Sequence, residues 1–170
     1  FLAVSHGQNR AILKKEKKDE REDFFNKIIN ELSQYKFTTF GFNKTEPIWG
    51  SNYFYHLSRS KIALNLSRGR YQNLYSSDRI SSLMGNGLLV FIDKKTNLEK
   101  IFEDKKDAIF FKNKKELIHK LNHYLQNDKE RINIARKGCL KYHNKFSNKN
   151  VVKFILSELN FTNDKINWFK

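Results

Sequence analysis

Short apolar runs rich in β-branched and aromatic residues alternate along this chain with longer stretches of helical periodicity. The apolar runs cover residues 1–5, 36–42, 61–66, 88–93 and 108–111. Runs of this length and composition are typical of buried strands. Strands that alternate with amphipathic helices form a parallel sheet whose faces the helices cover. We therefore expect the α/β fold class, with a parallel sheet flanked by helices.

The expected helices carry start signals and apolar residues at helical spacing. Asp19 and Asn113 are each followed three residues later by a glutamate, which is the spacing of a capping box. A further helix is expected over residues 128–145, and Ser147 is the expected N-cap of a last helix. The apolar residues are Phe25, Ile28, Ile29, Leu32 and Tyr35 on the first helix, Leu117, Leu121, Tyr124 and Leu125 on the next, and Val151, Phe154, Ile155 and Leu159 on the last.

One domain accounts for the length of the chain. Its 170 residues can bury a core without disulfides or metals, and neither an internal repeat nor a flexible linker divides them. We expect residues 1–159 to form this domain and residues 160–170 to form a polar C-terminal tail. The chain opens on Phe1 rather than on methionine, at what resembles the end of an apolar strand. We therefore also expect a fragment whose upstream part is missing.

The chain has one cysteine, Cys139, and no cluster of Cys and His at zinc-ligand spacing. A single cysteine forms no internal disulfide, which favours a reducing cytoplasm, and we expect neither a metal nor a cofactor. No apolar run approaches the roughly 18–20 residues of a membrane span, and no signal peptide is recognisable. We expect a soluble cytoplasmic protein.

A surplus of basic residues gives the chain a net charge of +15. Such a charge attracts nucleic acid, anionic lipid or phosphate-bearing substrates, and it fits a peripheral position at the inner face of the membrane. Abundant Lys, Asn and Ile with scarce Ala and Pro are also what an AT-rich genome produces, whatever the function. A nucleic-acid-binding module is the rival class, but helix-turn-helix, zinc-finger and RNA-recognition motifs are absent. We expect no nucleic-acid partner.

The loop after the third strand is the first place to expect a ligand, because ligands of open α/β sheets bind beyond the carboxyl ends of the strands. This loop carries Arg68 among small hydroxyl residues, and a short helix is expected to begin at Ser77 or Asp78. Ser76, Ser77 and Asp78 are all residue types that cap helix N-termini, where unpaired backbone N–H groups attract anions. The loop and the helix start therefore predict an anion site.

Arg79 stands in the first turn of this expected helix. A cation there opposes the helix dipole at a cost of roughly a few tenths of a kcal/mol, so its position is better explained if a phosphate lies nearby. The alternative is an ordinary surface ion pair with Asp78 or Asp93.

The short helix is expected to end at Gly85, Asn86 and Gly87, directly before the fourth strand. One of the two glycines would serve as a left-handed C-cap. Glycines on both sides of Asn86 also allow the backbone to approach a ligand closely, and a purely structural turn explains them equally well.

Five motifs occur in one order along the chain: SKIALNLSRG, YSSDRISSLMGNGLLVFID, LEKIFEDKKDAIFF, KELIHKLNHYLQNDKERINIARKG and KYHNKF. In these motifs the chain resembles the C-terminal domain of group 1 glycosyltransferases, and more closely the branch that includes the spore-maturation-type glycosyltransferase-like domain. The resemblance covers roughly residues 60–155. It implies the C-terminal half of a GT-B enzyme, in which two Rossmann-like domains face a cleft, with the N-terminal domain missing here.

The resemblance also implies a reaction. A sugar would pass from a nucleotide-diphosphate sugar to a hydroxyl of a glycan or lipid-linked acceptor, in surface glycan or polysaccharide biosynthesis. Residues 75–93 would form the core of the donor site, and Arg79 would be the catalytic residue that stabilises the departing diphosphate. The other implied donor contacts are Arg10, Lys15, Arg68, Ser76, Ser77, Asp78, Ser82, Gly85, Asn86 and Gly87.

Ser82 departs from the family pattern. Family members usually carry a glutamate here that hydrogen-bonds the ribose hydroxyls, and another one eight residues earlier, where this chain has Leu74. A serine can make one hydrogen bond to a sugar hydroxyl but not the paired contact of a carboxylate. The change leaves open a degenerate or epimerase-like GT-B domain that binds a sugar nucleotide.

Overall fold

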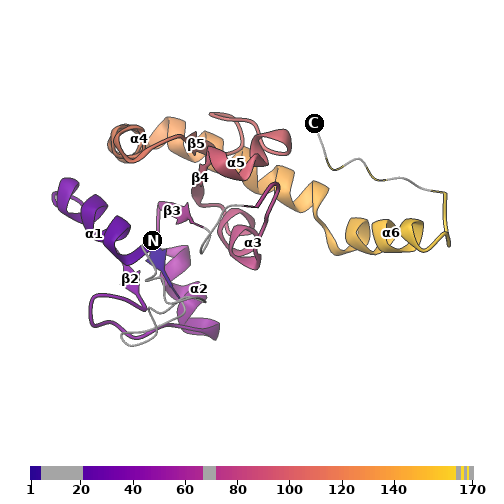
Figure 1. Ribbon diagram of the computed structural model, residues 1–170, viewed down its shortest axis with the longest axis horizontal. Helices are drawn as coiled ribbons and strands as arrows, with labels where there is room; N and C mark the ends of the chain where they lie inside the picture. The colour runs from indigo at the N-terminus through magenta and orange to yellow at the C-terminus, as the bar shows by residue number, and fades with distance from the viewer. Residues whose placement is uncertain (5–20, 67–71, 164–165, 167, 169–170) are drawn as a thin grey trace.

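The computed structural model of the chain describes residues 1–4, 21–66, 72–163, 166 and 168. In chain order the elements are β1 (Leu2–Ala3), α1 (Arg21–Glu31), β2 (Thr39–Phe40), α2 (Gly50–Ser58), β3 (Ile62–Asn65), α3 (Asp78–Gly85), β4 (Leu89–Asp93), the 3₁₀ turns η1 (Lys94–Thr96) and η2 (Leu98–Lys100), β5 (Ile109–Phe111), α4 (Lys114–Gln126), α5 (Asp128–Lys145) and α6 (Asn148–Glu158). Figure 1 shows β3, β4 and β5 in the middle of the molecule, with α1 and α4 to one side of them and α3 to the other.

The paired strands are all parallel. β1 pairs with β2, and β3, β4 and β5 form a second sheet in that order. The registers join Ile62 to Leu89 and Phe91 to Ile109. Each of the five expected strands is present, although β1 and β2 have only 2 residues each. The expected α/β class, with parallel strands flanked by helices, is confirmed.

Each face of the strands buries its own apolar cluster. The cluster that includes α1 and α4 contains Phe25, Ile28, Leu32, Phe91, Leu117, Leu121 and Tyr124. The cluster that includes α3 contains Ile80, Leu83, Met84, Val90 and Phe110. Ile29, Tyr35 and Leu125 are partly buried against the first cluster. The apolar faces that the sequence predicts for the first two long helices therefore pack in the core. The predicted helix start at Asp19 lies outside the described residues.

α2 is a helix that the sequence analysis did not predict. It begins at Gly50, whose φ of 56° lies in the left-handed region, and its N-cap Trp49 makes no side-chain capping hydrogen bond within the described residues. Of its 9 residues, all described, Leu57 alone is buried. A helix without a polar N-cap and with a single buried residue carries little of the pattern by which helices are recognised in a sequence.

A glycine allows α5 to pass close to the turn before β5. A Cβ atom added at Gly138 would lie 2.1 Å from the backbone oxygen of Asp107 and 3.1 Å from Cε of Met84 in α3. Lys141, one turn further along α5, forms an ion pair with the buried carboxylate of Asp107. α5 is therefore fixed against both this turn and α3.

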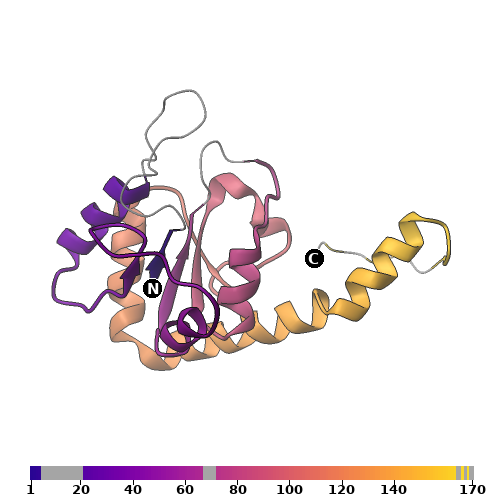
Figure 2. The same ribbon diagram turned by 90° about the horizontal axis from the view of Figure 1, so that it is seen from below.

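α6 projects away from the rest of the molecule (Figures 1 and 2). Ser147 is its N-cap, as predicted, and accepts a hydrogen bond from the backbone N–H of Asn150. None of its 11 residues, all described, is buried, and Leu159 directly after it is 59% exposed. The apolar residues predicted on the last helix therefore do not join the core. Within the described ranges, no helix combines the length and apolar character that crossing a membrane requires.

Candidate functional site

A pocket of about 440 Å³ lies beside β1 and β3, between α2 and α3. Its α3 wall is formed by Asp78, Arg79, Ser82 and Leu83, and its α2 wall includes Trp49, Tyr53 and Phe54. Trp49 is 68% exposed and Phe54 is 50% exposed, so both aromatic rings are accessible. The volume falls within the roughly 300–1,000 Å³ of small-molecule sites. A polar wall and an aromatic wall together suit a ligand that combines a charged group with a ring.

A larger cavity of about 650 Å³ lies near the amino ends of β2 and β3, among residues of α1 and α4. Its lining is mostly apolar and includes Ile28, Leu32 and Leu121. No residue predicted to bind a ligand lines this cavity, and in a parallel α/β fold ligands bind at the opposite, carboxyl ends of the strands. The smaller pocket is therefore the candidate site.

Arg79 is held at the carboxyl end of β3. Its Nη1 donates a hydrogen bond of 2.5 Å to the backbone oxygen of Leu66. Among the described residues Leu66 is its hydrogen-bond partner, and a guanidinium has five N–H donors. Neither Asp78 nor Asp93 lies within ion-pair distance of Arg79 in the described structure, and Asp93 instead accepts from the backbone N–H of Lys95. The surface ion pair considered as an alternative is therefore not formed.

Burial lowers the pKa of Arg79, and the positive charge of Arg21 lowers it further. Arg21, which is not among the predicted site residues, is the first residue of α1 and is 8% exposed. Both arginines thus stand in the first turn of a helix, and their charges are close enough to repel each other. An anion bound near Arg79 would relieve that repulsion. The sequence signal for Arg21 was weak because nothing in it shows that α1 and α3 begin near each other.

The start of α3 agrees with the prediction. Ser77 is the N-cap, with extended backbone angles, and Asp78 is the first helical residue. Within the described residues the Ser77 side chain makes no capping hydrogen bond. Ser76 precedes it and is exposed, and neither serine lines the pocket. The N-terminal N–H groups of α3 are therefore without the usual capping side chain.

Ser82 and Tyr53 line the same pocket from different helices. Ser82 lies one turn after Asp78 on α3, and Tyr53 lies on α2. Burial raises the pKa of Tyr53, with Asp78 adding to the rise, while the charge of Arg79 and the nearby hydroxyl of Ser82 act in the opposite direction. Tyr53 was not predicted as a site residue, because the helix that carries it was not predicted.

Gly85, Asn86 and Gly87 lie at the other end of α3, roughly 10 Å from Arg79 at about 1.5 Å per helical residue. Gly87 has a φ of 77°, and its N–H donates to the backbone oxygen of Met84 while that of Leu88 donates to Leu83. This is the Schellman arrangement of a helix C-terminus. The structure does not bring these three residues to the pocket, and the turn is accounted for structurally.

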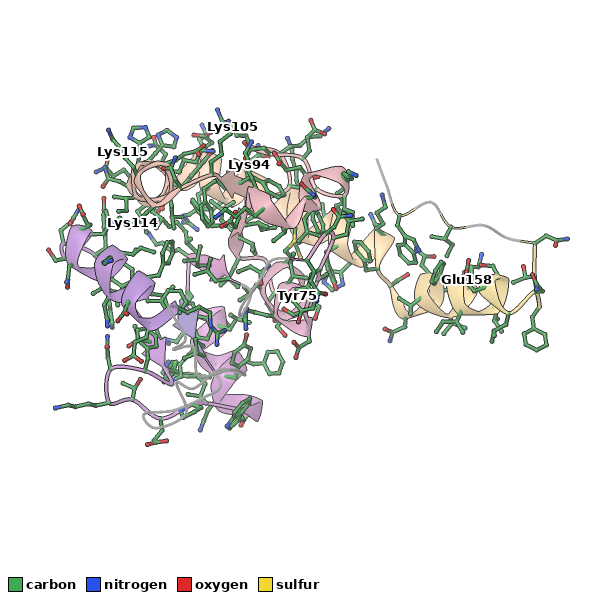
Figure 3. All side chains as sticks on the ribbon, viewed as in Figure 1. Tyr75, Lys94, Lys105, Lys114, Lys115 and Glu158 are labelled. Carbon is green, nitrogen blue, oxygen red and sulfur yellow. The ribbon has the colours of Figure 1, made fainter. Side chains whose placement is uncertain are left out.

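Three predicted donor contacts, Arg10, Lys15 and Arg68, lie outside the described residues. Figure 3 shows Lys94, Lys105, Lys114 and Lys115 on the α4 side of the molecule, while Tyr75 lies beside α3. These lysines are thus distant from α2, so they do not form the wall of the pocket. No group of three or more His, Cys, Asp or Glu able to hold a metal occurs in the described ranges.

Comparisons with known proteins bear on this site. A family model described as glycosyl transferase-like matches residues 17–157. The structure is similar to that of the C-terminal domain of a group 1 family glycosyl transferase, LpcC, from Francisella tularensis, with a TM-score of 0.58 and 15% identity over 85% of each chain. A search of curated proteins finds no match.

Proposed function

Since the chain belongs to the glycosyl transferase-like family, we propose that it is the donor-binding domain of a glycosyltransferase and holds a nucleotide-diphosphate sugar between α2 and α3. The observation that carries this proposal is the position of Arg79. Arg79 lies at the start of α3 and lines the 440 Å³ pocket. Its guanidinium donates a hydrogen bond to the backbone oxygen of Leu66 at the carboxyl end of β3. A diphosphate placed there would meet the guanidinium and the N–H groups of Asp78 and Arg79 at the helix start together.

The proposed reaction breaks the bond between the anomeric carbon and the diphosphate and forms a bond from that carbon to an acceptor oxygen. The acceptor hydroxyl loses its proton, and the nucleoside diphosphate leaves with an added negative charge. Arg79 and the start of α3 would stabilise that charge, without a metal ion. The groups that bind the acceptor and take its proton would belong to a second domain facing this one.

A glycan or a lipid-linked acceptor at the inner face of the membrane is the acceptor class that we propose. The net charge of +15 supports a position beside anionic lipid. A donor-binding domain that no longer catalyses transfer is the second candidate, and the observation that favours it is Ser82. This serine lines the pocket where family members usually have the ribose-binding glutamate.

Calorimetric titration of the purified chain with UDP, GDP and ADP tests the proposal. At least one of the three should bind, and the corresponding nucleoside, which lacks the diphosphate, should bind at least tenfold more weakly, because charge-assisted hydrogen bonds contribute about 1.5–3 kcal/mol each. Failure of all three diphosphates and of their sugar conjugates to bind would contradict donor binding. A salt-sensitive shift of DNA in the same preparation would instead favour the nucleic-acid alternative.

A further inference from the structure

The α2 wall of the pocket carries the hydroxyl of Tyr53, and Ser82 of α3 lines the same pocket close enough to influence the pKa of that hydroxyl. Tyr53 is half-buried, and its ring packs edge-on against Phe1 and Phe54, with centroid distances of 5.4 and 5.5 Å. These contacts fix the ring, so its hydroxyl is directed by packing rather than free to rotate through solvent. The two hydroxyls come from different helices and belong to the same pocket.

We propose that Tyr53 and Ser82 together bind the two ribose hydroxyls of the donor nucleotide, so that Tyr53 is a specificity-determining residue. This inference rests on the proposed function, because it concerns the same pocket. Serine alone offers a single hydroxyl, whereas a vicinal diol needs two neighbouring partners that can each donate and accept. The tyrosine supplies the second partner from the opposite wall.

The surroundings of Tyr53 suit this role. Burial is the largest influence on its pKa and raises it, so the phenol stays protonated at neutral pH and can donate to a ribose oxygen. Arg79, which would meet the diphosphate, is close enough to influence the same hydroxyl electrostatically. The ribose and the diphosphate are adjacent in a nucleotide, so their proposed partners should also be adjacent, as Arg79, Ser82 and Tyr53 are.

A purely structural contact between α2 and α3 is the competing explanation for the pair. The two explanations predict different ligand selectivity. A site that is built to hydrogen-bond a hydroxyl discriminates against an analogue that lacks it, because buried polar groups are then left without partners. A structural contact would give no such discrimination.

The test is calorimetric titration of UDP, GDP and ADP, and of their 2′-deoxy counterparts, with four chains. These are the unsubstituted chain, Tyr53→Phe, Ser82→Ala and the double variant. For whichever nucleotide binds, the unsubstituted chain should prefer the ribose form by about 5- to 10-fold, the effect of one hydrogen bond. Each single variant should weaken ribose binding by about 5-fold, and the double variant should bind both sugars equally.

Matched controls exist on the same two helices. Tyr55→Phe removes a hydroxyl from α2, and Ser81→Ala removes one from α3, at positions that do not line the pocket. Both should leave the preference for ribose unchanged. Thermal unfolding of each variant reports whether a loss of affinity reflects a loss of structure.

The outcomes separate the two proposals. If the unsubstituted chain binds none of the nucleotides, the proposed function fails, and this inference fails with it. If a nucleotide binds but the unsubstituted chain shows no preference for ribose, or the double variant retains the full preference, then Tyr53 and Ser82 are not the ribose partners while donor binding stands. The measurement on the unsubstituted chain needs no variant, so an absent preference for ribose overturns the inference even if Tyr53→Phe does not fold, and Ser82→Ala then tests the other partner.

Discussion

The two ends of α3 differ in how their polar groups are satisfied. At the C-terminal end, the carbonyls of Leu83 and Met84 receive N–H groups of the following turn, and the carbonyl of Gly85 contacts His143 Nε2 at 2.9 Å. At the N-terminal end, Ser77 makes no capping hydrogen bond within the described residues, and Arg79 lines the pocket. At the C-terminal end the chain itself supplies hydrogen-bond partners for the helix carbonyls, whereas at the N-terminal end a ligand could supply partners for the helix N–H groups. Residues at both ends are among the predicted donor contacts.

Arg79→Ala should have the largest effect, because it removes the cation from the ligand end. We expect the affinity for a nucleoside diphosphate to fall about 10- to 100-fold, as for the loss of a charged hydrogen bond of about 1.5–3 kcal/mol. The measurement is calorimetric titration with UDP, GDP and ADP. Arg59→Ala, at an exposed position directly after α2, is the matched control and should bind normally. An unchanged affinity of the Arg79 variant would show that Arg79 does not bind the diphosphate.

Gly138→Ala should act at the other end of α3, through packing. The added methyl would meet the backbone oxygen of Asp107 at 2.1 Å and Met84 of α3 at 3.1 Å. Because backbone must shift to admit it, we expect a loss of about 1–3 kcal/mol in the free energy of unfolding, measured by urea denaturation. Nucleotide affinity at a temperature where the variant is folded should change little. A stability equal to that of the unsubstituted chain would contradict the close approach of α5.

Gly87→Ala should cost about 1 kcal/mol of stability, since a residue with a Cβ is strained at a φ of 77°. Open space surrounds the position, so strain rather than a collision accounts for the loss. Gly85→Ala is the control, because Gly85 is helical without a positive φ and alanine favours a helix. A large loss of nucleotide affinity in the Gly87 variant, without a loss of stability, would instead show that this turn takes part in donor binding.

Ser77→Ala should have the smallest effect on stability, less than about 0.5 kcal/mol, because its side chain forms no capping bond within the described residues. Asn113→Ala provides the comparison. The Asn113 side chain accepts the N–H of Glu116 at 2.9 Å, so its loss should cost about 1 kcal/mol. Urea denaturation of both variants checks the difference. Equal losses would mean that the start of α3 is capped in solution like that of α4.

Local patterns in the sequence predicted the fold well. The capping residues Ser77, Asn113 and Ser147 stand where they were expected, because capping depends on residues a few positions apart. The strands were also recognised from local composition. α2 escaped recognition because Trp49 is an apolar N-cap residue and the helix buries only Leu57 among its residues.

The candidate site was predictable in part. Arg79 and Asp78 were recognised from the pattern of the helix start, and Ser82 from the family resemblance, and the structure places all three on one pocket wall. Tyr53 and Arg21 were missed because their relation to Arg79 depends on the arrangement of three helices. The turn at Gly85 and Gly87 was assigned to the site from composition, although glycines at a helix end serve structure and ligand approach alike.

The Schellman turn after α3 has a consequence for exchange of backbone hydrogens with solvent. The amides of Gly87 and Leu88 are bonded within the turn, whereas those of Asp78 and Arg79 have no acceptor among the described residues. Opening of this helix in the native state should therefore begin at Asp78 and proceed toward Gly85. A ligand at the pocket would slow deuterium uptake first at the residues that otherwise exchange fastest.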